Sequence, residues 1–479
     1  MHQTLRTSRM TVGGSALAGT GTFEVIDPAT GEPFAQAPDC TPDQLDLAMR
    51  AAADAFRTWR RDDDARRECL RQAADVMEAA TDTLAPLLTA EQGKPLADAR
   101  REVANSAVWL RYYADLELPR EIVQDDAGGY AEILHRPLGV VAAITPWNFP
   151  LILATWKIAP ALRAGNTMVV KPSPHTPLAT LAMGEVLQEA LPPGVLNVVS
   201  GRDPLGALMT AHPVPRKVSF TGSTATGRRV AATAADDLKR LTLELGGNDP
   251  ALILDDADPQ EIADSLFWAA FANNGQFCLA VKRVYAPESL YDDLVEALAD
   301  RARSVRVDTG TAEGVQLGPL NNRAQYDRVS ELVADALHHG ATAAAGGAPL
   351  DRPGYFYAPT ILSGLSDGTR VVDEEQFGPA LPVIAYRDLD DAIERANTGD
   401  YGLTASVWSP DLDRAAKVAT ELDAGQVAVN IHGLGVRPDL PFGGHKQSGL
   451  GVENGHWGLH GYTDIQVLTR PAKPEAAAE

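Results

Sequence analysis

Short apolar segments that indicate strands alternate with helical patterns over most of this chain, and that alternation limits the folds open to it. Buried strands are expected at 140–145, 167–171, 197–199, 218–221 and 241–244, with helices between them. A second alternating series begins at 251–254 and runs to about Asn430. Such alternation predicts mostly parallel sheets covered by helices. Because 479 residues exceed what one hydrophobic core usually holds, we expect two α/β domains in tandem.

Other elements flank these two series. Thr41, followed by Pro42 and Gln44, predicts a capping box with proline at the first helical position. Amphipathic helices are expected at 66–91 and 96–116, and an extended hairpin at 120–137 with its turn at 126–129. Glycines interrupt the apolar part of residues 1–22, so a flexible tail is expected there in place of a signal peptide. Residues 473–479 are expected to be a frayed end.

Composition excludes several classes of function. The 42 basic and 64 acidic residues give a net charge of −22, which argues against binding to nucleic acid or to an anionic membrane surface. The longest apolar stretch, 149–162, is interrupted by Lys157 and Pro160 and is too short to span a bilayer. The three cysteines lie far apart and form no zinc-binding pair, so we expect no metal, no disulfide and a cytoplasmic location.

Cys278 ends the segment Asn-Asn-Gly-Gln-Phe-Cys, directly after an apolar helical pattern at 262–271. An arbitrary cysteine is usually a small buried hydrophobe, and Cys40 and Cys69 are interpreted in that way. The polar turn residues before Cys278 weaken this interpretation without removing it. A reactive thiolate is the alternative.

Glu244 ends an apolar strand and is followed by Leu245, Gly246, Gly247 and Asn248. Ligand crevices form at the carboxyl ends of strands in α/β sheets. A carboxylate there can act as a general base if partial desolvation raises its pKa. A charge on the protein surface at the end of the strand is the alternative.

Two turns after other strands carry weaker signals. Residues 220–228 run from an apolar strand through Gly222 and Ser223 into a helix, whose first N–H groups can hold a phosphate. Their spacing matches neither common phosphate-binding motif, so a tight turn with an N-cap explains them equally well. Residues 146–150 place Asn148 between two aromatic residues and two prolines. Its amide can stabilise an oxyanion or cap the next helix.

Taken together, these four segments resemble the NAD(P)-dependent aldehyde dehydrogenase superfamily in content, order and spacing, over residues 25–467. Further matching stretches lie at 26–32, 171–173, 375–379 and 441–444. The resemblance implies that Cys278 attacks the aldehyde carbon, and that the Asn148 amide and the Cys278 N–H hold the oxyanion. It implies that hydride leaves for the nicotinamide, and that Glu244 activates water to hydrolyse the thioester.

The resemblance also implies a cofactor, NAD or NADP, and a pocket for the aldehyde. Positions matching the family's cofactor cleft are Thr145, Trp147, Lys171, Ser173, Gly222, Ser223, Gly227, Gln325, Glu375 and Phe377. Positions matching its apolar substrate tunnel are Phe149, Leu153, Trp156, Phe277 and Phe442, with Leu434 and Val436 in a loop that varies. These walls favour an apolar aliphatic or aromatic aldehyde, although Arg437 lies close in sequence.

The implied fold is α/β, with a Rossmann-like cofactor domain, a second α/β catalytic domain and a β-hairpin oligomerisation arm. By this resemblance the cofactor domain covers 23–117 and 138–245, and the catalytic domain covers 246–445. Residues 118–137 and 446–479 form the arm and the C-terminal tail. A homodimer or homotetramer is implied as well.

Three questions remain open on the sequence. A CoA-acylating aldehyde dehydrogenase would pass the thioester to coenzyme A, although such enzymes commonly lack the base that Glu244 matches. A non-catalytic scaffold on this fold is the other alternative, against which Cys278, Glu244 and Asn148 speak. NAD-selective members place a glutamate three residues after the lysine that matches Lys171, and this chain has Pro174 there. We therefore expect only modest discrimination against NADP.

Overall fold

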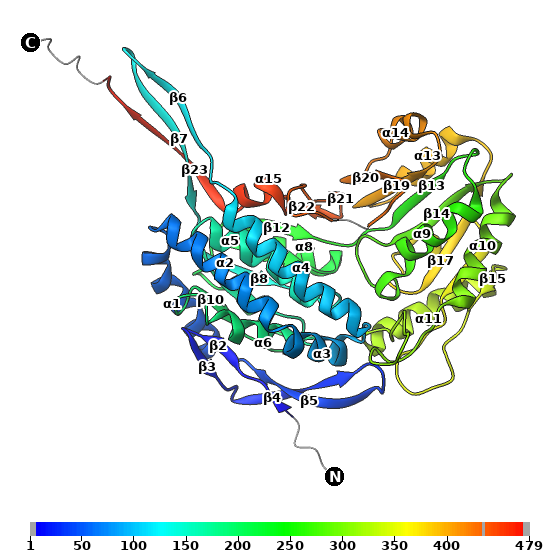
Figure 1. Ribbon diagram of the computed structural model, residues 1–479, viewed down its shortest axis with the longest axis horizontal. Coiled ribbons are helices and arrows are strands. Elements are labelled where there is room, and N and C mark those ends of the chain that lie inside the picture. The colour runs from blue at the N-terminus through cyan, green and yellow to red at the C-terminus, as the bar shows by residue number, and fades with distance from the viewer. Residues whose placement is uncertain (1–5, 434–435, 473–479) are drawn as a thin grey trace, which may run out of the picture.

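The computed structural model describes residues 6–433 and 436–472, and it contains two helix-covered sheets with a long hairpin projecting beyond them (Figure 1). The first sheet has eight strands in the order β22-β12-β11-β8-β9-β10-β2-β3. Its five middle strands run parallel, and chain order proceeds outward from β8 on both sides, as in a Rossmann sheet. The strands are β2 (Met10–Val12), β3 (Ser15–Leu17), β8 (Val140–Ile144), β9 (Thr167–Lys171), β10 (Leu196–Val198), β11 (Lys217–Thr221), β12 (Arg240–Glu244) and β22 (Gly449–Leu450).

Helices cover this sheet, and the capping box predicted at Thr41 begins the first of them. Helix α5 packs on β8 and β9, and α4 packs in turn on α5. Figure 1 shows α2 and α4 running alongside each other over the first sheet. The helices are α1 (Pro42–Trp59), α2 (Asp63–Ala79), α3 (Thr81–Gln92), α4 (Leu96–Asp115), α5 (Pro150–Arg163), α6 (Leu178–Leu187), α7 (Leu205–Ala211) and α8 (Thr224–Ala235).

The second sheet has seven strands in the order β15-β16-β17-β14-β13-β19-β20, all parallel except β15. Two hydrophobic clusters pack against it. Its strands are β13 (Asp249–Ile253), β14 (Val281–Pro287), β15 (Thr342–Ala345), β16 (Thr360–Leu365), β17 (Ala380–Tyr386), β19 (Thr404–Trp408) and β20 (Gln426–Val429). Its helices are α9 (Pro259–Phe271), the 3-10 turn η1 (Ala272–Gly275), α10 (Tyr291–Ser304), α11 (Arg323–His338), α12 (Arg370–Asp373), α13 (Leu389–Asn397) and α14 (Leu412–Ala419). The predicted pair of α/β sheets is confirmed.

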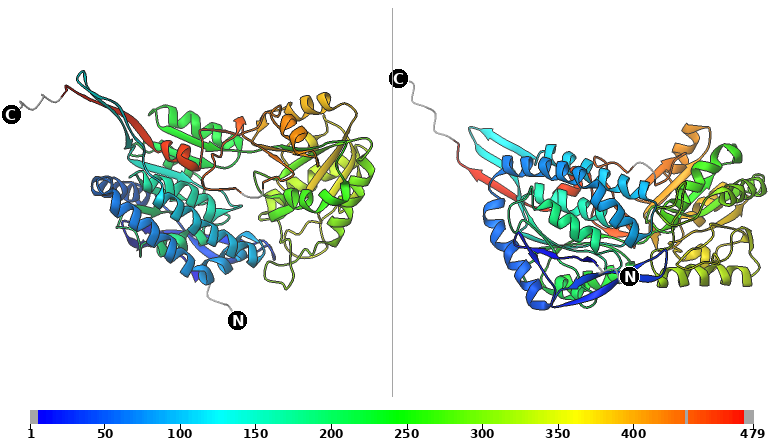
Figure 2. Two further views of the ribbon diagram at one scale, coloured as in Figure 1. Left: turned by 45° about the horizontal axis from the view of Figure 1, so that its top comes forward. Right: turned by 60° about the horizontal axis from the view of Figure 1, so that its bottom comes forward.

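The predicted hairpin is also confirmed and gains a third strand. β6 (Arg120–Asp126) and β7 (Gly129–Pro137) form the hairpin, and β23 (Thr463–Arg470) pairs along β7. The three strands extend away from the two helix-covered sheets (Figure 2). The remaining elements are β1 (Arg6–Thr7), β4 (Gly21–Asp27), β5 (Glu32–Asp39), β18 (Tyr401–Gly402), β21 (His445–Lys446) and α15 (Gly455–His460).

The expectation of a flexible tail over 1–22 is wrong for the residues that the structure describes. β2 pairs with β10 through Thr11 and Val198, and β2 and β3 form a hairpin on the edge of the first sheet. Gly13 and Gly14, which suggested flexibility, have φ of 60° and 81° and make the turn of that hairpin. Residues 1–5 and the predicted frayed end at 473–479 lie outside the described residues.

The single helix expected at 66–91 is two helices, α2 and α3. Ala80 lies between them with φ −84° and ψ 4°, outside helical geometry. The Thr81 hydroxyl donates to the Glu78 carbonyl at 2.7 Å. A side-chain bond of this kind offers the backbone an alternative to the helix, and periodicity alone does not reveal it.

Candidate active site

Four predicted site positions lie at the carboxyl edge of the first sheet. Thr145 follows β8, Lys171 ends β9, Gly222 follows β11 and Glu244 ends β12. The Thr145 N–H donates to the Lys171 carbonyl at 3.0 Å, and the Gly222 N–H donates to the Glu244 carbonyl at 3.0 Å. Because the strands are parallel, their carboxyl ends meet at one edge, where α/β sheets bind ligands.

The Glu244 carboxyl group is buried, and neither of its oxygens has a hydrogen-bond partner among the described residues. Burial raises the pKa of Glu244 well above its usual range, Glu453 raises it further, and Lys157 lowers it. A carboxylate with a raised pKa is a stronger base once it is ionised, and its free oxygens can receive a proton from a ligand or a water. The alternative of a charge on the protein surface is therefore excluded.

Cys278 follows a loop whose backbone is unusual. Asn273, Asn274 and Gly275 are consecutive left-handed residues with φ of 50°, 59° and 68°. Asparagine and glycine tolerate this conformation best, which explains the Asn-Asn-Gly sequence. The loop is fixed by side-chain bonds, including that from Gln276 Nε2 to the Asn273 carbonyl at 3.0 Å. Such a loop presents the following thiol in one defined position.

Cys278 is half-buried as a residue, so it is not sealed in the core. Burial of the thiol raises its pKa to about 12, with Lys282 opposing and Glu244 adding to the rise. With this raised pKa, the Cys278 thiol stays protonated near the buried Glu244 carboxyl group. A thiolate forms there when a base takes the proton or a positive charge enters the site.

Asn148 lies beside the Cys278 loop, in the segment between β8 and α5. Its carbonyl accepts hydrogen bonds from Asn273 Nδ2 at 3.2 Å and from Lys94 Nζ at 2.9 Å. The side chain is buried, and Oδ1 has no hydrogen-bond partner among the described residues. The structure thus brings a side-chain amide next to the loop that carries the thiol.

The predicted cofactor positions line the same edge. Glu375 Oε1 accepts the Gly247 N–H at 3.1 Å, and the Phe377 and Trp147 rings pack edge to face at 5.4 Å. Ser223 caps α8, its Oγ accepting the Thr226 N–H at 3.3 Å. A Cβ atom at Gly227 would collide with the Leu245 side chain, so glycine lets α8 pack closely.

Unpartnered polar groups at this edge fit a polar ligand such as a dinucleotide. The hydroxyls of Thr145 and Thr224 are buried without hydrogen-bond partners in the described part of the chain. Burial lowers the pKa of Lys171 to about 8, while Asp203 and Asp39 raise it. Lys171 Nζ donates to the neighbouring Pro172 carbonyl at 3.1 Å, and the start of α8 offers backbone N–H groups for a phosphate.

Two predicted cofactor positions, Gln325 and Ser173, use their side chains to bond backbone groups of the chain itself. Gln325 Nε2 donates to the carbonyls of Gln376 and Phe377 at 2.7 and 2.9 Å, so Gln325 supports the Phe377 backbone. Ser173 Oγ accepts the His175 N–H at 3.3 Å, which is a bond within its own turn.

The predicted substrate residues that the structure describes all belong to the large hydrophobic core of the first sheet or to its boundary. Leu153, Trp156, Phe277 and Phe442 are buried members of this core, and Phe149, Val436 and Cys278 pack against it. Trp156 contacts Phe442 edge to face at 5.3 Å and stacks on Trp109 at 5.8 Å. Leu434 lies outside the described residues. Arg437 donates to Asp439 at 2.9 and 2.6 Å and is therefore already paired with a carboxylate.

Comparison with known proteins agrees with this geometry. The model of the aldehyde dehydrogenase family matches residues 16–468. The chain belongs to the aldehyde dehydrogenase family. A phenylacetaldehyde dehydrogenase from Pseudomonas fluorescens is 41% identical over 467 residues, covering 93% of this chain and 92% of that protein.

Solved structures show the same family fold. An aldehyde dehydrogenase from Bacillus cereus in complex with NAD+ has a TM-score of 0.95 and 35% identity, covering 98% of this chain and 97% of that one. An NADP-dependent enzyme from E. coli has a TM-score of 0.94 and 36% identity, covering 97% and 98%. The predicted family, fold class and enzyme class are confirmed, and the family includes both NAD and NADP enzymes.

Sequence analysis missed a buried ion pair beside Glu244. Lys157 Nζ lies 2.5 Å from Glu453 Oε1 and 2.8 Å from the Thr221 hydroxyl. Both side chains are almost completely buried. A lysine in the apolar helix at 150–163 could have indicated a buried carboxylate partner, because a buried ammonium group needs one. Glu453 gave no comparable signal, since it is 296 residues away in the chain.

Two further findings bear on function classes. Within the described ranges, no three His, Cys, Asp or Glu side chains are grouped closely enough to hold a metal ion. None of the helices in the described part of the chain combines the length and the apolar character of a bilayer span. Cys40, Cys69 and Cys278 are all free thiols. The cytoplasmic location stays a prediction.

Proposed function

We propose that this aldehyde dehydrogenase oxidises apolar aldehydes to carboxylic acids, with Cys278 as nucleophile, Glu244 as base and Asn148 as oxyanion donor. The observation that carries the proposal is the position of Cys278. Cys278 is half-buried, its thiol lies close enough to the unpartnered Glu244 carboxyl group for that charge to raise the pKa of the thiol, and it follows a loop in which Asn273 bonds to the Asn148 carbonyl. A bound nicotinamide supplies the hydride acceptor. Thr145, Lys171, Glu375 and the first N–H groups of α8 would hold it.

The chemistry of the chain's own residues follows from this arrangement. The Cys278 thiol gives its proton to a water molecule that carries it to solvent, and Sγ bonds to the aldehyde carbon, whose oxygen becomes an oxyanion next to the Asn148 amide. Loss of hydride from that carbon leaves a thioester on Cys278. Glu244 then takes a proton from water as the water oxygen attacks the thioester, which releases the acid and restores the thiol. Lys157 lowers the pKa of Glu244 and thereby favours the ionised base.

The two sheets divide this work. We assign the Rossmann-type sheet, with residues 23–117 and 138–245, to cofactor binding, and residues 246–445 to the domain that carries Cys278. The supporting observation is that Thr145, Lys171 and Gly222 follow strands of the first sheet, whereas the Cys278 loop precedes β14 of the second.

Aliphatic and aromatic aldehydes are expected to be better substrates than acidic ones. The predicted pocket residues are apolar, and Arg437 is paired with Asp439. An aldehyde carboxylate would therefore lose its hydration without gaining an ion pair. We expect kcat/KM for phenylacetaldehyde or hexanal to exceed that for succinic semialdehyde by about 100-fold, or ~2.7 kcal/mol. A preference for succinic semialdehyde in a spectrophotometric panel would contradict this assignment.

Both NAD and NADP are expected to support turnover, with kcat/KM for NAD within about 100-fold of that for NADP. Pro174 leaves no carboxylate at this turn to bind the ribose hydroxyls or repel a 2′-phosphate. Lys171 offers a cation, and its pKa of about 8 means that NADP use should decline as the pH rises through 8. Burial lowers the pKa of His175, so His175 adds no charge at neutral pH.

Steady-state kinetics with both cofactors at saturating aldehyde measure this ratio, and Pro174→Glu is the matched variant. The new carboxylate should lower kcat/KM for NADP more than for NAD. A wild-type preference for NAD beyond about 1,000-fold, left unchanged by Pro174→Glu, would mean that another group selects the cofactor.

We also propose that the arm docks on a second copy of the chain to form a homodimer or homotetramer. The arm carries exposed apolar side chains that a single chain leaves uncovered, among them Ile122, Val123, Ile465 and Val467. Apolar patches of this kind mark contact surfaces. Sedimentation equilibrium tests the proposal, because a single-chain mass at micromolar concentration would contradict it.

A further inference from the structure

A buried ion pair between Lys94 and Glu102 contacts the same Asn148 carbonyl as the Cys278 loop. Lys94 precedes α4, and Glu102 projects from α4. Lys94 Nζ donates to Glu102 Oε2 at 2.6 Å, and the two side chains are 1% and 2% exposed. Removing two charges from water is costly, and a well-packed apolar pair is often equally stable. A contribution to stability alone therefore explains this pair poorly.

Both partners bind the segment that carries Asn148. Lys94 Nζ donates to the Asn148 carbonyl at 2.9 Å and lies 3.8 Å from the centre of the Phe149 ring. Glu102 Oε1 accepts the N–H groups of Leu151 and Ile152 at 2.9 and 3.2 Å. These two N–H groups belong to the first turn of α5, where a helix has no partners of its own. The pair thus fixes both the Asn148 backbone and the start of the helix that follows it.

The Asn148 side chain depends on this backbone support. Its Oδ1 has no partner in the part of the chain that the structure describes, so the direction of the amide is set by its backbone and by packing. The Asn148 carbonyl has a second donor, Asn273 Nδ2, from the loop that carries Cys278. Lys94, Asn148 and the Cys278 loop therefore meet at one carbonyl oxygen.

We propose that Lys94 and Glu102 are positioning residues that aim the Asn148 amide at the oxyanion formed when Cys278 attacks the aldehyde. This inference rests on the proposed function, in which Asn148 is an oxyanion donor. An oxyanion donor acts only within a narrow range of distance, and a displacement of about 1 Å can cost roughly 100-fold in rate. Without the ammonium group, the Asn148 carbonyl keeps one donor and the segment can shift.

The test uses Lys94→Met in the full-length enzyme, which keeps the length of the side chain and removes its charge. The rate of NADH formation in the first turnover should fall about 10- to 100-fold, while KM for the aldehyde and Kd for the cofactor change little. Alkylation of Cys278 by iodoacetamide forms no oxyanion, so its rate should not change. Lys239→Met is the matched control, because Lys239 is also a buried lysine, 2.6 Å from the Asp237 carboxylate, and lies away from the site. Its first-turnover rate should stay at the wild-type value.

A double-mutant cycle with Asn148→Ala separates positioning from general damage. If Lys94 acts through the amide, Lys94→Met should cause no further loss in the Asn148→Ala background. Losses that multiply would overturn the inference, as would a matching loss in the alkylation rate. An unchanged rate in Asn148→Ala alone would instead refute the oxyanion role in the proposed function.

A second variant covers the case in which Lys94→Met does not fold. Glu102→Gln keeps an acceptor for the Leu151 and Ile152 N–H groups but removes the charge that holds Lys94. It should lower the first-turnover rate by a smaller factor and show the same lack of additivity with Asn148→Ala. A wild-type rate in Glu102→Gln, or full additivity, would overturn the role of the pair.

Discussion

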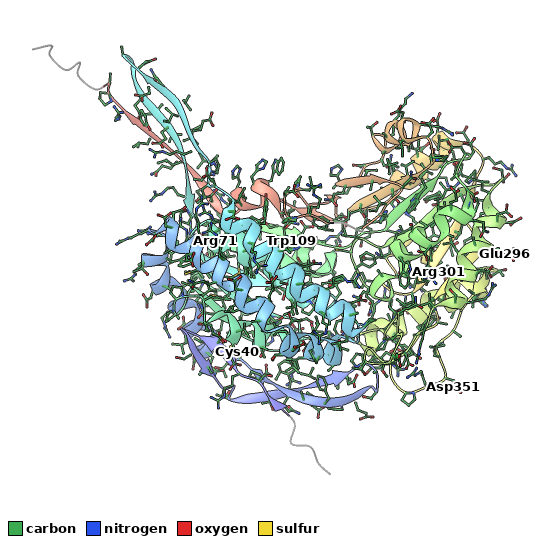
Figure 3. The ribbon with its side chains drawn as sticks, viewed as in Figure 1. Cys40, Arg71, Trp109, Glu296, Arg301 and Asp351 are labelled. Carbon is green, nitrogen blue, oxygen red and sulfur yellow. The ribbon has the colours of Figure 1, made fainter. Side chains whose placement is uncertain are left out.

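Replacement of Cys278 by alanine is expected to lower NADH formation by about 10⁴-fold or more, because the thioester route has no other nucleophile. The structure supports this expectation by position. Burial and the Glu244 carboxyl group both raise the pKa of the Cys278 thiol, whereas Cys40 lies next to the N-terminal strands (Figure 3). The Cys40 N–H donates to the Ser200 carbonyl at 2.9 Å, so Cys40 is held beside the turn that follows β10. Cys69 lies on α2, and neither Cys40 nor Cys69 matches the nucleophile position of the family.

Matched variants make the experiment specific. Cys40→Ala and Cys69→Ala remove a thiol of the same kind and should retain near-normal turnover. Binding of NADH, followed by fluorescence, should survive in Cys278→Ala, because the cofactor positions lie on other elements. Near-normal turnover in Cys278→Ala would show that the nucleophile is wrongly assigned. Loss of both turnover and cofactor binding would indicate a folding defect instead.

The sequence predicted the strands well because a strand buried on both faces is a short apolar run between turn residues. β9 has the predicted ends, and the strands around it differ by a residue or two at their boundaries. The resemblance assigned roles to Cys278, Glu244 and Asn148, and these roles stay predictions; the structure bonds the Asn148 carbonyl to Asn273 in the loop before Cys278. Turn glycines misled the prediction at 1–22, since Gly13 and Gly14 are as typical of a hairpin turn as of a flexible tail.

Partners of buried charges could not be predicted. Lys157 and Glu453 pair across 296 residues, and the Asn148 carbonyl accepts from Lys94 across 54 residues. Such contacts depend on how helices pack, and no local pattern records them. Gln325 shows a different limit of the prediction. It matches a cofactor position of the family, but its side-chain amide donates to the backbone carbonyls of Gln376 and Phe377. A residue type at a matched position is thus a weaker guide than the hydrogen bonds that it makes.

Glu244→Gln is expected to separate the two halves of the reaction. Glutamine has the shape of glutamate but cannot take a proton from water, so the thioester should form and then persist. The steady-state rate should fall about 100- to 10,000-fold, while rapid mixing shows a burst of NADH that approaches one per site. Mass spectrometry should find the acyl group on Cys278. Because no described residue bonds to the Glu244 oxygens, the substitution breaks no hydrogen bond and should leave the fold intact.

The control and the alternatives decide how Glu244 acts. Glu91→Gln is the matched control, since Glu91 is also a buried carboxyl group but is bonded to the N–H groups of Leu178 and Ala179 at the start of α6. It should show neither a burst nor an adduct beyond wild type. If Glu244→Gln loses the burst together with turnover, Glu244 acts before hydride transfer, by taking the Cys278 proton. If added coenzyme A restores turnover and gives an acyl-CoA product, the thioester is accessible to a thiol acceptor and the CoA-acylating alternative gains support. Slow release of free acid, unchanged by coenzyme A, is the result that the buried, unpartnered carboxyl group beside Cys278 leads us to expect.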